Sequence, residues 1–77
     1  MKFHCLDVVV LEKDLPAHRL KRGDLGAVVE VYEPDRLEVE FVTASGHTNA
    51  LVTLNEGDVR HVVEDDLVTV RQYTRTA

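Results

Sequence analysis

Hydrophobic and polar residues alternate along this chain in short runs that end at glycine, proline or acidic turn residues. The clearest run is Leu37–Val42, in which three apolar side chains share one side of an extended strand and two glutamates share the other. No stretch of comparable length shows the period of an amphipathic helix. The pattern therefore predicts an all-β protein.

The same reasoning predicts five strands. We expect them at Leu6–Leu11, Ala27–Tyr32, Leu37–Val42, Asn49–Leu54 and Leu67–Tyr73. The residues after the first strand form a long loop, because the proline within them has no amide hydrogen for a strand ladder. Five short strands around one small core favour a small five-stranded SH3-like barrel with a long loop after the first strand.

The segment between the last two predicted strands leaves an alternative open. Asn55–Asp58 breaks the fourth strand, and Val59–Val62 is either a single 3-10 turn or a short extended piece. A four-stranded meander with a helical turn at residues 57–62 is therefore the competing architecture. Residues 74–77 are expected to fray as a tail.

Alternation also predicts which side chains form the core. With only 77 residues the chain can build one core, so residues 1–77 are expected to form a single domain. Two leucines in the long loop, Leu15 and Leu20, are expected to pin it to this core. The inward-facing set is Val8, Val10, Val29, Val31, Val39, Phe41, Val52 and Leu54.

Several of these segments resemble a known family. Asp7–Leu11, Leu20–Tyr32, Leu37–Val42 and Ala50–Leu54 are similar to a bacterial family known only as a domain of unknown function, number 4926. The resemblance covers roughly residues 6–62, which is most of the domain, and implies a small SH3-like β-barrel with no established activity. A weaker resemblance, to the KOW element of ribosomal and transcription proteins, rests on Arg22–Val31 and implies a β-turn-β unit.

No arrangement of residues predicts catalysis. A nucleophile needs a base within hydrogen-bond reach and a group that orients the base. Ser45 and His47 lie in an exposed turn, which is a poor place to hold such a pair. Cys5 and His4 are neighbours on an extended chain and point to opposite sides, so Cys5 is expected to be a half-buried structural thiol. We therefore expect a protein that is not an enzyme.

Metal and cofactor sites are not expected either. The four histidines, His4, His18, His47 and His61, show neither the helical nor the strand spacing that brings ligands together. One cysteine cannot form a thiolate cage. The acidic run Glu64–Asp66 lacks the glycine and oxygen-ligand pattern of a calcium loop. The sequence thus predicts no metal and no cofactor.

The net charge of −5 is unevenly distributed. Residues 1–22 carry five Lys/Arg and three Asp/Glu, whereas residues 23–77 carry four Lys/Arg and eleven Asp/Glu. An acidic body is repelled by phosphate backbones and anionic lipids, so binding to nucleic acid or to membranes is not expected. The short apolar runs and the lack of a signal-peptide pattern predict a cytoplasmic protein.

The basic residues gather in the long loop, and they are Lys13, His18, Arg19, Lys21 and Arg22. Loops on rigid scaffolds concentrate binding residues, so we expect this loop to meet a protein partner with an acidic patch. The predicted function is a non-enzymatic protein-interaction module of the bacterial cytoplasm, such as an accessory or immunity-type partner of a neighbouring gene product. The alternatives are an RNA- or ribosome-associated KOW-like domain, or charges that only keep the loop solvated.

Overall fold

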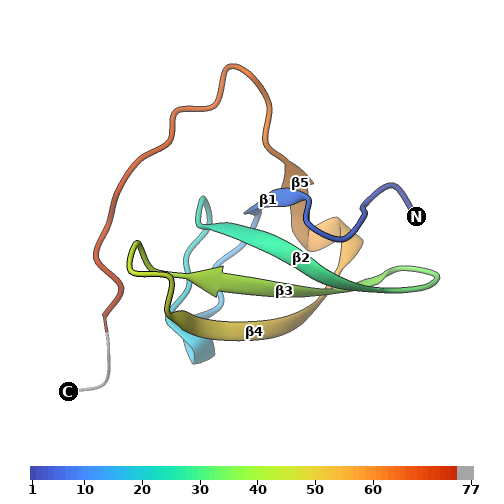
Figure 1. Ribbon diagram of the computed structural model, residues 1–77, viewed down its shortest axis with the longest axis horizontal. Helices are drawn as coiled ribbons and strands as arrows, with labels where there is room; N and C mark the ends of the chain where they lie inside the picture. The colour runs from blue at the N-terminus through green and yellow to red at the C-terminus, as the bar shows by residue number, and fades with distance from the viewer. Residues whose placement is uncertain (75–77) are drawn as a thin grey trace.

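A computed structural model of the protein describes residues 1–74 as one antiparallel five-stranded sheet (Figure 1). The strands lie side by side in the order β4-β3-β2-β1-β5. No helix in these residues is long and apolar enough to cross a membrane. The elements are β1 Val8–Leu11, the 3-10 turn η1 Pro16–His18, β2 Leu25–Tyr32, β3 Arg36–Val42, β4 Thr48–Asn55, the 3-10 turn η2 Glu56–Asp58 and β5 Val59–His61.

The all-β class and the number of strands are confirmed, but the sheet does not close into a barrel. Within residues 1–74, β4 and β5 are the two edges of the sheet, and no strand pairing joins them. The long loop after β1 is present, and Leu15 and Leu20 form an isolated bridge across its base. Leu20 is buried, as expected for a residue that pins the loop to the core. Most of the predicted fraying tail lies outside the described residues.

The identity of the fifth strand was predicted wrongly. Leu67–Tyr73 forms no strand, and the edge beside β1 is taken by β5, with Val59 opposite Leu11. The physical reason lies in η2, where the Asp58 carboxylate accepts the Asn55 backbone N–H in a capping box. This turn ends β4 and leads directly into Val59, so the residues right after η2 pair with the free edge of β1. Of the two readings of Val59–Val62, the short extended piece is correct for its first three residues.

The predicted core is correct in β3 and β4 and out of register in β1. Val39, Phe41, Val52 and Leu54 are buried in one cluster. In β1, however, Val9 is fully buried and Val8 is 51% exposed. A continuous apolar run has no alternation to show which side chains face inward, so the choice between the two registers was open. Val10 is buried on the opposite face of the sheet from Val9.

A β-bulge accounts for the second register error. The pairing of β2 with β3 shifts between Val28 and Glu30, which inserts one extra residue into β2. As a result Val28 is fully buried and Val31 packs against the same core, although the two are three residues apart. Val29, predicted as a core residue, is 38% exposed.

The N-terminal segment contributes a core residue that the strand pattern did not reveal. Phe3 precedes β1 and is 1% exposed. Its ring stacks on that of His61 in β5, with 4.4 Å between the ring centroids. The aromatic ring covers the end of the core beside the short edge strand and extends the core beyond the predicted strands.

Candidate functional site

The predicted binding loop, residues 13–22 and hereafter the basic loop, is held by its backbone. Leu15 and Leu20 exchange two backbone hydrogen bonds of 2.9 and 3.1 Å. The Arg22 N–H donates to the Asp14 carboxylate over 2.9 Å, and the Lys21 N–H donates to Asp24 Oδ2 over 2.8 Å. Because these bonds use backbone donors, the loop has a defined shape while its cationic side chains remain available.

The five predicted binding residues of the basic loop fall into two groups. Lys13 forms an ion pair with Asp58, 3.3 Å from Nζ to Oδ1, and the Arg19 guanidinium donates to the Thr74 carbonyl. The side chains of the other three form no hydrogen bond or ion pair with any residue in 1–74, and all three residues are exposed. They are His18, Lys21 and Arg22. Three of the five predicted residues are therefore exposed and have no side-chain partner within residues 1–74.

The segment after β5 leaves the sheet, arcs around it (Figure 1) and returns beside the basic loop, where Tyr73 contacts His18. We call residues 63–74 the strap. At its start, the Arg60 guanidinium donates to both oxygens of the Asp66 carboxylate over 2.8 and 2.9 Å. The Val63 N–H also donates to Asp66 over 2.7 Å. These bonds, that of Arg60 first, lower the pKa of Asp66 to about 2.

The far end of the strap is attached to the body by Arg71 and Tyr73. The Arg71 guanidinium donates through Nε to Asp24 Oδ1 over 2.8 Å and through Nη2 to Asp24 Oδ2. The Tyr73 hydroxyl donates to the His18 carbonyl over 2.9 Å. Partial burial acts to raise the pKa of Asp24, but the bonds from Arg71 and from the Lys21 N–H outweigh it, and the pKa lies below its ordinary value.

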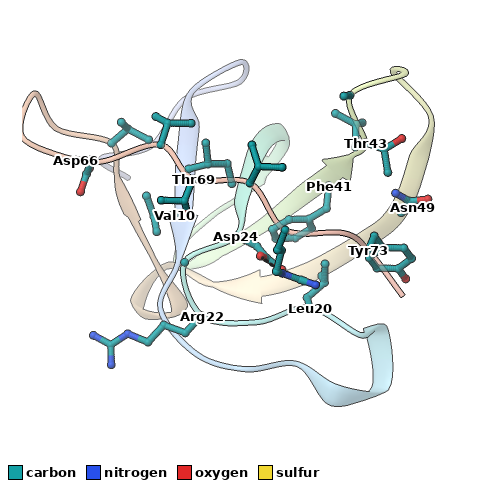
Figure 2. A pocket seen from close by; sticks show the side chains of 18 of the residues that line it. Val10, Leu20, Arg22, Asp24, Phe41, Thr43, Asn49, Asp66, Thr69 and Tyr73 are labelled. Carbon is teal, nitrogen blue, oxygen red and sulfur yellow. Dashed lines mark hydrogen bonds and ion pairs between the residues drawn. The ribbon is translucent and has the colours of Figure 1, made fainter. Parts of the chain in front are cut away.

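Between the strap and the sheet lies a space of about 880 Å³, hereafter the strap groove. Figure 2 shows the strap running across this space, with Asp24 and Phe41 beneath it and Tyr73 near its end. Asn49 also lines the groove, and its buried Oδ1 has no hydrogen-bond partner in the described residues. It is the residue of β4 left unpaired where the register with β3 shifts.

The matched part of the chain contains the sheet and the basic loop but not the strap. A family model described as a domain of unknown function, DUF4926, matches residues 5–61. The chain belongs to the DUF4926 family. This confirms the first resemblance. No curated protein and no solved structure matches the chain. In this DUF4926 chain the groove floor at Asp24 and Phe41 lies inside the family match, and the strap follows it.

Within residues 1–74, Ser45 forms no hydrogen bond with His47, and Cys5 forms none with His4. The Ser45 hydroxyl lies 2.9 Å from the Thr43 hydroxyl, in the turn between β3 and β4. Cys5 is exposed rather than half-buried, because it lies in the turn before β1 and not in the strand. The described residues hold no group of three His, Cys, Asp or Glu side chains that could bind a metal ion.

The acidic run after β5 has a structural role that its sequence did not show. Asp66 binds Arg60, so one of the three carboxylates is already paired. Arg71 and Asp24 are likewise partners from distant parts of the chain. Neither pair follows a local spacing rule, so only the path of the folded chain could reveal the strap contacts.

Proposed function

We propose that this chain is a non-enzymatic protein-interaction module whose partner binds the basic loop. The observation that carries the proposal is the contrast between a loop backbone that is held by hydrogen bonds and the exposed side chains of His18, Lys21 and Arg22. A shaped loop loses little conformational entropy when a partner binds, which favours affinity. In Figure 2 the Arg22 side chain points away from the strap.

Charge indicates the chemistry of the partner. The two free cations Lys21 and Arg22 stand on a body whose residues 23–77 are strongly acidic. Such a charge pattern attracts an acidic patch to the loop and repels it from the rest of the surface, so it orients the partner during encounter. An accessory or immunity-type protein that binds a neighbouring gene product in the bacterial cytoplasm fits this description.

We also propose that the sheet is an open form of the SH3-like barrel. Short strands, a long loop between β1 and β2, two bulges and a 3-10 turn between β4 and β5 support this proposal. Closure would bring the edge strands β4 and β5 together. Nuclear Overhauser contacts between the backbones of these two strands in solution would mark the closed form.

A pair of charge reversals tests the function. Tagged full-length protein should capture a partner from its host, and Lys21→Glu with Arg22→Glu should slow association at least about tenfold. The matched control is Lys2→Glu with Arg36→Glu, which changes the net charge equally at exposed sites away from the loop. A partner that responds equally to both pairs would contradict the proposed surface.

The nature of the captured molecule separates this function from the RNA-binding alternative. A protein partner should persist after nuclease treatment and show a shallow dependence on salt. Binding to RNA releases counterions and weakens steeply as salt rises. Nuclease-sensitive capture with a steep salt slope would therefore favour the KOW-like function.

A further inference from the structure

We propose that the strap groove binds an extended segment of a partner protein, and that the strap occupies this groove, with a poor fit, in place of that segment. The segment has an arginine that binds Asp24, an aromatic hydroxyl two residues later that binds the His18 carbonyl, and an apolar side chain two residues before the arginine. The groove lies under the strap, and of the free cations of the basic loop only Arg22 lines it. The inference concerns an extended ligand beneath the strap, so it goes beyond the function proposed above.

The arginine position is defined by Asp24. The Asp24 side chain is only 16% exposed, and its two oxygens receive two guanidinium nitrogens of Arg71. A planar guanidinium matches a carboxylate in this two-pronged geometry, whereas the ammonium group of lysine is a single point charge. The position therefore selects arginine over lysine.

The aromatic position lies next to η1. The Tyr73 hydroxyl donates to the His18 carbonyl, and its ring packs against the hydrophobic core while the side chain stays partly exposed. Arg71 and Tyr73 both contact the body, whereas Val70 before them is 96% exposed and Gln72 between them is exposed. Arg71 and Tyr73 thus hold the strap to the body, while Val70 and Gln72, which also line the groove, stay exposed.

The strap fills the groove poorly at the third position. Thr69, two residues before Arg71, lines the groove but stays exposed. A threonine offers little apolar surface to the neighbouring Val10 and Phe41. The apolar side chains of the strap are instead exposed to solvent: Leu67 is 89% and Val68 72% exposed. A segment with a larger apolar residue in place of Thr69 would bury more surface.

Two further observations favour an outside ligand over a permanent internal one. Asn49 Oδ1 is buried at the groove with no partner in residues 1–74, and a donor on a better-fitting segment would satisfy it. The groove floor lies within the family match to residues 5–61, whereas the strap lies beyond it. The floor of the groove therefore lies in the matched part of the chain, whereas the strap, which lines its other side, follows that part.

The test is a competition between the strap and a free peptide. A labelled peptide of residues 66–74 is titrated into the full-length protein and into the full-length Arg71→Ala variant. The internal strap competes at a high effective concentration, so its release should tighten peptide binding about tenfold or more. A peptide carrying Thr69→Leu should bind Arg71→Ala about tenfold more tightly than the unaltered peptide.

Controls locate the effect in the groove. Asp24→Asn combined with Arg71→Ala should weaken peptide binding at least about tenfold, because the carboxylate charge is lost while the side chain stays similar in shape. Arg36→Ala removes an arginine at the start of β3 and should leave affinity within about twofold of the wild type.

The proposal has clear contrary outcomes. Equal peptide affinity for the wild type and for Arg71→Ala would overturn it, provided that circular dichroism shows the variant to be folded. The milder Arg71→Lys variant repeats this comparison. A Thr69→Leu peptide that binds no better than the unaltered one would also overturn it. Concentration-dependent dimerisation of Arg71→Ala would overturn the assignment to a partner protein, because the occupant would then be the strap of a second copy.

Discussion

The carboxylate of Asp24 holds the guanidinium of Arg71 in a two-pronged ion pair that joins positions 47 residues apart. It fastens the strap to the turn that precedes β2. Arg71 also donates to the Arg19 carbonyl over 3.2 Å, so the same side chain touches the basic loop. Loop, turn and strap therefore meet at one guanidinium.

Removing this ion pair should free the strap without unfolding the sheet. The pair is partly exposed, so Arg71→Ala should cost at most about 1 kcal/mol of unfolding free energy. The strap should nevertheless become more accessible to chymotrypsin at Leu67 and Tyr73, measured by mass spectrometry over a time course. Arg36→Ala is the matched control and should be cut no faster than the wild type. Unchanged cleavage of Arg71→Ala would show that other contacts hold the strap.

Acid should loosen the other end of the strap. Asp66 has its pKa lowered to about 2 by Arg60 first and by the Val63 N–H second. Since the folded pKa lies below the ordinary value of 3.8, this contribution to stability is present above that value and is lost as pH falls toward 2. Nuclear magnetic resonance titration of the Asp66 carboxyl should give the low midpoint, and Arg60→Gln should move it back toward 3.8. A wild-type midpoint near the ordinary value would contradict the Arg60 contact.

Neighbouring valines in β1 should differ sharply in their effect on stability. Val9 is fully buried, so Val9→Ala should cost about 2 kcal/mol of unfolding free energy through lost burial and a small cavity. Val8 is 51% exposed, so Val8→Ala should cost about 0.5 kcal/mol or less. Denaturant unfolding measures both. The reverse order would restore the register that the sequence pattern first favoured.

Sequence reasoning succeeded where alternation was unambiguous. The run at Leu37–Val42 has charged residues between apolar ones, so its inward face could be assigned correctly. It failed where alternation was absent, as in β1, or interrupted, as at the bulge between Val28 and Glu30. A bulge changes which side chains face inward without any required change of composition, so the exposure of Val29 had no signal in the sequence.

The candidate site was predictable only in part. The basic loop stood out because its charge differs in sign from that of the rest of the chain. The strap groove depends on Asp24, Arg71 and Asp66, whose partners are brought together by the return of the chain over the sheet. Residues 67–73 read as a strand because β-branched residues suit extended backbone whether or not a ladder partner exists.

Two glycines offer a test of how tightly β2 packs on β3. A Cβ built at Gly26 would lie 2.6 Å from Val39 Cγ1, 2.9 Å from Phe41 Cε1 and 3.1 Å from the Glu40 carbonyl oxygen. Val39 and Phe41 are themselves buried, so they have little room to move, and Gly26→Ala should cost about 1–3 kcal/mol of unfolding free energy through overpacking.

Gly57 in η2 is the matched control for this substitution. No atom lies within 4 Å of a Cβ at this position, and its backbone is not in the left-handed region. Gly57→Ala should therefore leave stability unchanged or raise it by about 0.4–1 kcal/mol, because alanine reduces the conformational entropy of the unfolded chain. Thermal and denaturant unfolding of both variants measure the difference. If Gly26→Ala proved as stable as Gly57→Ala, β2 and β3 would have to pack more loosely than the structure shows, and the side chains that form the groove floor beside Phe41 would be free to shift.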